Sequence, residues 1–340
     1  MPAPLVPRVV CGPHPPPRLT GATVRRLQHL RSEVGARARD DWNRVVTARD
    51  PVTTLKRRHR SVNRATFKMH EIAGRLEPGT PPPRTVVLLA EAPGGFLQAV
   101  RKRWPGCRCV ASSYSGTGAI PFAEPDDAAL VSLPRAGDLR LAEVEDALAA
   151  AVAERLGASR ADRADLVTAD GGEDHTAHLD DTEQHSTVLV LAQLATALRV
   201  QAQGGTLVLK VFEGSTTVTR QIFQLLRGLY RTSKVAKPLC SKAGNSERYF
   251  VAEGLHDVEH ALAVGRSLRE GVERCMRERL FPTALEGVTP DATVHVAFDT
   301  MSRAQAGQLE VLLETTGDAV HALRRVASRE ARTLERTVLA

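Results

Sequence analysis

The chain has 340 residues, of which 42% are hydrophobic and 25% are charged. This length allows about two domains, and this hydrophobic content excludes a mostly disordered chain. Lys and Arg number 46 against 39 Asp and Glu, and the resulting net charge of +7 suits a polyanionic partner. The apolar runs are too short to cross a bilayer, so no membrane partner is expected.

The cysteines and the N-terminal segment indicate in which cellular compartment the protein is expected. Five cysteines, an odd number without paired Cys-x-x-Cys motifs, argue against both a disulfide framework and a structural zinc. The proline-rich start lacks the apolar stretch of a signal peptide. We therefore expect reduced thiols in an intracellular protein of the cytoplasm or nucleus, or in a virion if the origin is viral.

Two segments are predicted before the first apolar strand pattern. Residues 1–19 are rich in proline and are predicted to form an unstructured tail. Residues 20–54 repeat apolar side chains such as Val24, Leu27 and Leu30 at helical spacing. This second segment is predicted to be a basic, helical N-terminal extension.

Between residues 55 and 253, short apolar runs alternate with helical patterns. The predicted strands are 86–90, 107–112, 166–169, 206–212 and 248–252. The predicted helices are 64–76, 96–103, 141–156, 186–202 and 217–230. This alternation predicts an α/β fold with a mostly parallel sheet, helices on both faces and ligands at the carboxyl ends of the strands.

Residues 254–340 show a different pattern. A helix is predicted from Leu255 to Met276, a short strand over 294–298 and two further helices within 301–339. The segment contains no constellation of catalytic residues. It is predicted to be a mainly helical C-terminal extension with a structural or partner-binding role.

Polar residues follow the predicted strands where a cleft is expected. The strand 86–90 runs into a Pro-Gly-Gly turn, whose glycines allow a ligand to approach the backbone closely. Asp170 and Lys210 end two later strands, and Glu247 comes just before another. Each residue alone fits a solvated strand end or a turn. Only seven of the 46 basic residues are lysine, however, which makes Lys210 more informative.

Five motifs that follow one another along the chain resemble those of a known protein family. Asn-Arg-Ala-Thr-Phe-Lys at 63–68, Glu-Ala-Pro-Gly-Gly-Phe at 91–96, Ala-Asp-Gly-Gly at 169–172, Lys210 and Asn-Ser-Glu-Arg-Tyr at 245–249 resemble the FtsJ-type 2'-O-ribose RNA methyltransferases. The match covers about residues 55–253 and implies a Rossmann-like methyltransferase fold. The third and fifth motifs are closer to the mRNA cap branch than to the ribosomal RNA branch.

By this resemblance, the catalytic residues are the tetrad Lys68, Asp170, Lys210 and Glu247, and the cofactor is S-adenosylmethionine. A ribose hydroxyl is a poor nucleophile, so its attack on a methyl group needs help in removing the proton. A neutral lysine can take that proton, whereas arginine does not deprotonate in proteins. We assign Lys210 as the base, Asp170 as its orienting partner, and Lys68 and Glu247 as supports.

The resemblance also implies a set of cofactor contacts. These are Asn63, Glu91, Ala92, Pro93, Gly94, Gly95, Phe96, Asp138 and Leu139. Asn63 can equally be read as a helix N-cap. Leu88 and Ala90 stand where many family members carry Asp and Gly, and the usual acid after the second strand is absent.

RNA contacts are predicted at Arg57, Arg58 and Arg60, because this basic cluster precedes the tetrad lysine, and at Asn245 and Ser246. The group 101–103 is left undecided between RNA contact and a solvated face. No metal site is predicted, although His175, His178 and His185 lie near Glu173 and Asp174.

The expected substrate is the cap-proximal nucleotide of mRNA. Two alternatives stay open: a ribosomal or transfer RNA 2'-O-methyltransferase, and a non-catalytic RNA-binding capping subunit. A partner in the capping machinery could bind the C-terminal extension.

Overall fold

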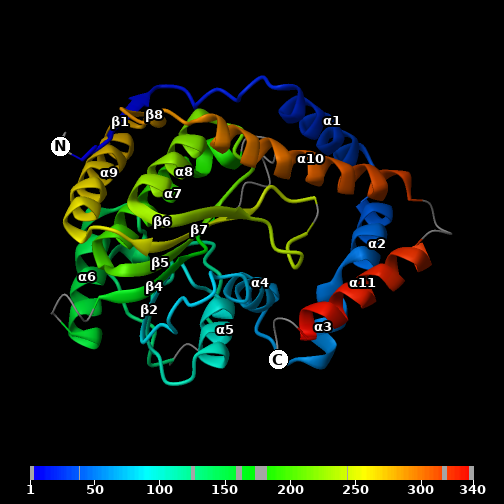
Figure 1. The fold of residues 1–340 in the computed structure, drawn as a ribbon, viewed down its shortest axis with the longest axis horizontal. Helices are drawn as coiled ribbons and strands as arrows, with labels where there is room; N and C mark the ends of the chain where they lie inside the picture. The colour runs from blue at the N-terminus through cyan, green and yellow to red at the C-terminus, as the bar shows by residue number, and fades with distance from the viewer. Residues whose placement is uncertain are drawn as a thin grey trace.

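The structure is a computed structural model that describes residues 4–37, 39–123, 127–157, 163–172, 182–242, 244–315 and 320–336. A six-stranded sheet forms its centre (Figure 1). The strands are β2 (Thr85–Leu89), β3 (Arg108–Ala111), β4 (Ala164–Ala169), β5 (Gln201–Val211), β6 (Tyr230–Ala236) and β7 (Arg248–Leu255). Their order is β3-β2-β4-β5-β7-β6. The first four run parallel, and β7 is antiparallel to β5 and β6. The predicted α/β fold is confirmed.

Helices cover both faces of this sheet, because alternate side chains of a strand point to opposite sides. On one face, Val87, Leu207 and Phe250 belong to a large apolar core. On the other face, Leu88 and Val251 belong to a second core. The first core includes side chains of α6 (Ala142–Leu156), α7 (Thr182–Val200), α8 (Thr217–Leu229) and α9 (Val258–Glu278), and the second includes those of α4 (Arg64–Ala73) and α5 (Gly95–Arg103).

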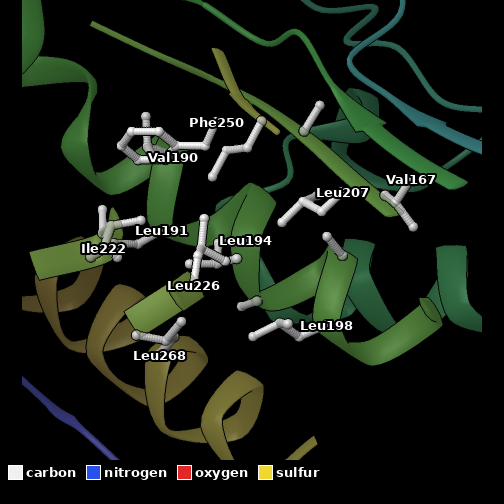
Figure 2. Packing of buried hydrophobic residues seen from close by; sticks show 14 of the residues in the cluster. Val167, Val190, Leu191, Leu194, Leu198, Leu207, Ile222, Leu226, Phe250 and Leu268 are labelled. Carbon is white, nitrogen blue, oxygen red and sulfur yellow. The ribbon is translucent and has the colours of Figure 1, made fainter. Parts of the chain in front are cut away.

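Figure 2 shows how the first core is packed. Leu191 and Leu194 of α7 lie among side chains of the sheet and of two further helices. The neighbours include Ile222 of α8 and Leu268 of α9, all fully or almost fully buried. Helix α9 therefore contributes to the main core, although its residues fall in the predicted C-terminal extension. The predicted domain boundaries stay predictions.

The prediction of an unstructured tail over 1–19 is wrong for part of that segment. Strand β1 (Arg8–Gly12) pairs antiparallel with β8 (Phe281–Glu286) in a two-stranded sheet. Val9 is buried against α9 at Gly271, where a Cβ atom would lie 2.3 Å from the Cβ of Val9. The prolines surround a short β-branched run, and its pairing partner lies about 270 residues away in the sequence.

The predicted strand over 294–298 is also wrong, because these residues lie in helix α10 (Ala292–Glu314). Val294 and Phe298 are fully buried, whereas Val296 between them is 59% exposed. Burial thus follows i,i+4 spacing, and the alternating apolar pattern is a coincidence of helix faces. Asp291 caps the helix by accepting a hydrogen bond from the backbone N–H of Val294.

The N- and C-terminal helices pack against each other beside the sheet (Figure 1). Leu27 and Leu30 of α1 (Ala22–Ala36) contact Ala306 and Leu309 of α10. Further along, α2 (Arg39–Arg49) and α3 (Pro51–Arg58) pack on the C-terminal helix α11 (Val320–Leu334). Helices α1, α2 and α3 therefore form one helical layer with α10 and α11. Helix α3 leads directly into α4, which carries the first of the predicted tetrad residues.

Candidate active site

Lys68 and Glu247 form a buried ion pair at the edge of the sheet. Helix α4 presents Lys68, whose Nζ lies 2.7 Å from Oε1 and 2.8 Å from Oε2 of Glu247. The Ser241 hydroxyl donates a hydrogen bond to the same carboxylate over 2.7 Å. Burial alone would raise the pKa of Glu247, but the charges of Lys68 and Lys210 lower it to about 2. Glu247 is therefore a stable anion at neutral pH.

Asp170 and Lys210 meet at the carboxyl ends of two adjacent strands. Ala169 of β4 pairs with Leu209 of β5, so the next residue in each strand reaches the same edge of the sheet. Lys210 Nζ donates a hydrogen bond to the Asp170 backbone carbonyl over 2.7 Å and lies 3.4 Å from Asp170 Oδ1. The structure thus brings these two predicted residues into contact.

Tyr249 links the two pairs, and sequence reasoning assigned it no role. Its hydroxyl donates to Asp170 Oδ1 over 2.8 Å and accepts a longer hydrogen bond of 3.5 Å from Lys68 Nζ. Tyr249 is fully buried, and burial together with the charges of Asp170 and Glu247 raises the pKa of its hydroxyl well above the ordinary value. Tyr249 therefore acts as a neutral donor that connects all four tetrad residues. The sequence feature that could have revealed this role is the place of Tyr249 in the Asn-Ser-Glu-Arg-Tyr motif.

A second lysine holds the loop that carries Glu247. Lys237 Nζ donates to the backbone carbonyls of Asn245 and Glu247 and to Asn245 Oδ1, over 2.9, 3.1 and 3.0 Å. Burial lowers the pKa of Lys237 to about 7, although the Glu247 carboxylate opposes this shift. From the C-terminal helices, Gln305 of α10 donates to the same Asn245 carbonyl over 2.7 Å. Sequence analysis missed this support, and its only signal was the scarcity of lysine.

A cavity adjoins the outer side of this loop. Its volume is about 500 Å³, and Lys237 and Ser241 form part of its wall. The opposite walls come from α2, α3, α10 and α11. The helical layer therefore contributes to the surroundings of the loop that carries Glu247.

The predicted glycine turn joins β2 to α5. Gly94 has a φ of 109°, which other residues rarely adopt. A Cβ atom on Gly95 would lie 2.1 Å from Asn63 Oδ1, so this position requires glycine for packing. Asn63 accepts a hydrogen bond from the Ala65 backbone over 2.9 Å and caps α4. The N-cap reading of Asn63 is thus confirmed, whereas its cofactor contact stays a prediction.

Glu91, within this loop, directs its carboxylate into the protein. Its Oε1 accepts a hydrogen bond from the Leu97 backbone over 2.8 Å, which satisfies a free N–H in the first turn of α5. Burial, together with the nearby charge of Asp170, raises the pKa of Glu91 to about 8, against the opposing effect of the backbone N–H groups. Phe96 is fully buried in the adjoining core. The side chains of both predicted cofactor residues thus support the loop from inside.

The remaining predicted cofactor residues lie after β3. Asp138 accepts hydrogen bonds from the Arg140 backbone and guanidinium over 3.1 and 2.8 Å. Burial opposes its ionisation, but Arg140 holds the pKa of Asp138 below its ordinary value. Leu139 is buried, and Ser113 approaches this turn so closely that a Cβ on Gly137 would lie 2.6 Å from its carbonyl oxygen.

The predicted RNA residues occupy different environments. The side chain of Arg57 lies outside the described part of the structure. Arg58 is half exposed and donates to Glu335 Oε2 over 2.7 Å, and Arg60 is exposed. Asn245 is held by Lys237, and Ser246 is partly buried beside it. Of the undecided group 101–103, Arg101 forms an ion pair with Asp127.

The histidine-rich segment falls mainly outside the described residues, including Glu173, Asp174, His175 and His178. His185 is described and makes an edge contact with Phe281. Within the described ranges, no three His, Cys, Asp or Glu side chains are grouped as metal ligands would be. No helix in that part of the chain is long and apolar enough to span a membrane.

Comparisons with known proteins find several RNA methyltransferases. The chain is 30% identical over 213 residues to ribosomal RNA large subunit methyltransferase E of Rhodopseudomonas palustris, covering 62% of this chain and 83% of that protein. It is 25% identical over 252 residues to cap-specific mRNA (nucleoside-2'-O-)-methyltransferase 2 of Drosophila melanogaster, covering 66% and 35%. A Trypanosoma brucei cap-specific methyltransferase 1 matches at 36% identity over 114 residues, covering 33% and 29%.

The FtsJ-like methyltransferase family matches residues 61–255, which is more than half of the chain. This range contains α4, the whole six-stranded sheet and the four residues of the predicted tetrad. The chain therefore belongs to the FtsJ-like methyltransferase family.

Proposed function

We propose that Lys68, Asp170, Lys210 and Glu247 carry out methyl transfer to a ribose 2'-hydroxyl at the cap-proximal nucleotide of mRNA. The chain is an RNA 2'-O-methyltransferase that uses S-adenosylmethionine, as its family membership establishes. The observation that carries the proposal is the continuous set of contacts from Glu247 through Lys68 and Tyr249 to Asp170 and Lys210.

Several features of the cleft fit S-adenosylmethionine. The glycine turn at 93–95 follows the carboxyl end of β2, and the N-terminus of α5 begins there. The Ser112 hydroxyl at the end of β3 is buried and has no hydrogen-bond partner among the described residues. We assign the methionine end to the glycine turn and the adenine to Asp138. The cofactor supplies a methyl group on a positively charged sulfur.

The tetrad can then activate the acceptor. When the 2'-oxygen takes the methyl group that the bound cofactor would supply, the hydroxyl proton would pass to the Lys210 amine. Asp170, 3.4 Å from the Lys210 amine, stabilises the ammonium that forms. Lys68 and Glu247 stay paired and hold the Tyr249 hydroxyl, and hence Asp170, in position. Most of the rate enhancement comes from this alignment.

Two observations support the cap as the substrate. The Ala-Asp-Gly-Gly and Asn-Ser-Glu-Arg-Tyr motifs are closer to the cap branch of the family, and two of the relatives are named cap-specific mRNA methyltransferases. The bacterial relative, named as a ribosomal RNA methyltransferase, makes ribosomal RNA the second candidate.

The test is methyl transfer from labelled S-adenosylmethionine to three acceptors at equal concentration. These are a short capped RNA, the same RNA with a 5'-triphosphate, and large-subunit ribosomal RNA. The proposal predicts that the capped RNA is the best acceptor, with the label on the first transcribed nucleotide. Preferential labelling of ribosomal RNA would replace the cap proposal by the second candidate.

A further inference from the structure

The outward face of α11 carries a stripe of arginines. Arg325, Arg329, Arg332 and Arg336 follow one another at i, i+4, i+7 and i+11, so they share one face of the helix. Arg324 lies beside the first of them. All five are exposed, and none forms an ion pair with an acidic side chain among the described residues.

The opposite face of the same helix is apolar and buried. Leu323, Ala327, Ala331 and Leu334 are each less than a tenth exposed. Ala331 and Leu334 pack with Phe67, the residue before the tetrad lysine, in a small core cluster that also contains Cys240, the residue before Ser241. The C-terminal end of α11 is therefore fixed beside the proposed acceptor site.

Acidic residues of α11 do not neutralise the stripe. Glu330 is bound by Arg49 of α2, with one contact of 2.7 Å. Glu335, just beyond the helix end, is bound by Arg58 and His59, and these partners lower its pKa even though burial opposes them. Both carboxylates are thus used to attach α11 to the N-terminal helices.

Helix α9 gives the contrasting case of a solvated face. Its exposed side mixes Arg266, Arg274 and Arg277 with acidic residues, and Arg274 pairs with Glu278 over 3.3 Å. Such mixing is ordinary for a surface in contact with water. The exposed face of α11 carries positive charges only, and this needs another explanation because like charges along one helix face repel each other.

We propose that the arginine stripe of α11 binds the phosphates of the substrate RNA outside the reacting nucleotide, an inference that rests on RNA as the substrate. From Arg324 to Arg332 the helix extends about 12 Å, enough to contact more than one phosphate of an RNA strand. Glu335, next to Arg336 in the sequence, contacts Arg58, and the buried face of α11 packs on Phe67, so RNA bound along the stripe would lead toward the tetrad. Guanidinium groups suit phosphate oxygens, and such contacts carry little sequence information.

The experiment compares two variants of the full chain. In the first, Arg325→Gln, Arg329→Gln and Arg332→Gln remove three charges while keeping good helix formers. In the matched control, Arg266→Gln, Arg274→Gln and Arg277→Gln remove the same charge from α9. Binding of a labelled 30-nucleotide RNA is measured at several salt concentrations, and turnover is measured on a capped trinucleotide.

The stripe variant should lose RNA affinity by about tenfold or more at low salt, and its salt slope should fall by roughly one unit for each lost contact. Its turnover on the trinucleotide should equal that of the parent, because so short an acceptor does not reach the stripe. The α9 control should match the parent in both measurements.

Equal loss of affinity in both variants, or no loss in either, would overturn the inference. The inference would also be overturned if the stripe variant lost binding to phosphatidylserine vesicles while its RNA affinity stayed unchanged, since the stripe would then bind a membrane surface. A parent enzyme that binds the long RNA but methylates no RNA acceptor would contradict the proposed tetrad chemistry and leave the stripe assignment intact.

Discussion

Two glutamates near Asp170 have opposite electrostatic environments. Glu91 lies on the proposed cofactor side, where burial raises its pKa to about 8 and its partners are backbone N–H groups. Glu247 lies on the acceptor side, where Lys68 and Lys210 overcome burial and lower its pKa to about 2. Both carboxyl groups are mainly out of contact with water, so their neighbours decide their charge at neutral pH.

This difference separates the tasks of the two sides. The cofactor side is shaped by glycines, helix ends and an acid that is largely neutral at pH 7, so it adds little negative charge of its own. The acceptor side concentrates lysines and carboxylates, which hold one another in register for a proton transfer. Replacing the carboxylate by an amide should therefore destabilise the protein at Glu247 and should not destabilise it at Glu91.

The largest loss of stability is expected for Glu247→Gln. Lys68 would keep its buried charge without a counter-charge, and breaking such a pair costs about 3 kcal/mol or more. The measurement is urea unfolding at pH 7, with Glu278→Gln on the surface of α9 as control, for which the expected loss is under about 1 kcal/mol. Equal free energies of unfolding for both variants would remove the distinction between the two sides.

The same substitution has a defined pH signature. The folded pKa of Glu247 lies below its unfolded value, so its contribution to stability is present above about pH 4.5 and is lost as the pH falls toward 2. The Glu247→Gln variant should therefore show a weaker loss of stability in acid than the parent. The measurement is the urea midpoint at several pH values between 3 and 7.

Glu91→Gln should have the opposite pH signature. Because the folded pKa of Glu91 is raised, the folded parent loses up to about 1.4 kcal/mol of stability per pH unit between about 4.5 and 8 through this group. The neutral amide lacks this loss. We expect the variant to match the parent near pH 5 and to exceed it at pH 8.5 in thermal unfolding. If the stabilities of the variant and the parent changed with pH in parallel, Glu91 would already be ionised in the folded parent.

Tyr249→Phe tests the link between the two tetrad pairs. Removing the hydroxyl takes away the hydrogen bond to Asp170 and should lower kcat about tenfold, with KM and cofactor affinity unchanged. Tyr230→Phe is the matched control, because its equally buried hydroxyl donates to Gln201 on β5, outside the tetrad contacts. The control should lose stability but keep kcat. A similar fall in kcat for both would make Tyr249 merely structural.

The smallest effect is expected for Ala90→Gly. Ala90 has a φ of 53°, a left-handed conformation that costs an alanine about 1–2 kcal/mol. Many family members carry glycine at this place, which fits the conformation. Since glycine also gains freedom in the unfolded chain, the net stabilisation should be under about 1 kcal/mol, measured by thermal unfolding. Destabilisation would mean that the methyl group contributes more by packing than it costs in strain.

The sequence was most informative where local pattern decides structure. Between β2 and α8, apolar runs alternate with amphipathic segments, and the strand ends at Asp170 and Lys210 follow from those patterns. The four tetrad residues come together because the parallel strands β4 and β5 share a carboxyl edge, the antiparallel strand β7 begins at that edge, and α4 packs beside it. Strand β6 was not predicted, because its largely polar sequence is stabilised by pairing with β7 alone.

The remaining misses depend on partners distant in the sequence. Strand β1 exists because β8 pairs with it, and Val294 and Phe298 are helical because their shared face is buried. The role of Lys237 depends on burial beneath a loop that only the folded chain forms. Likewise, the arginines of α11 gain meaning only when the acids near them are seen to bind other helices.

The central claim is that Lys210 takes the proton from the ribose hydroxyl at the proposed acceptor site. The most direct measurement is single-turnover methyl transfer by Lys210→Arg, alongside calorimetric binding of S-adenosylmethionine and of RNA. Arginine keeps the charge but cannot accept the proton, so the rate should fall by about 10²–10⁴ while both affinities stay near those of the parent. A variant that transfers methyl groups at nearly the parental rate would contradict the assignment of Lys210 as the base and leave alignment alone as the mechanism.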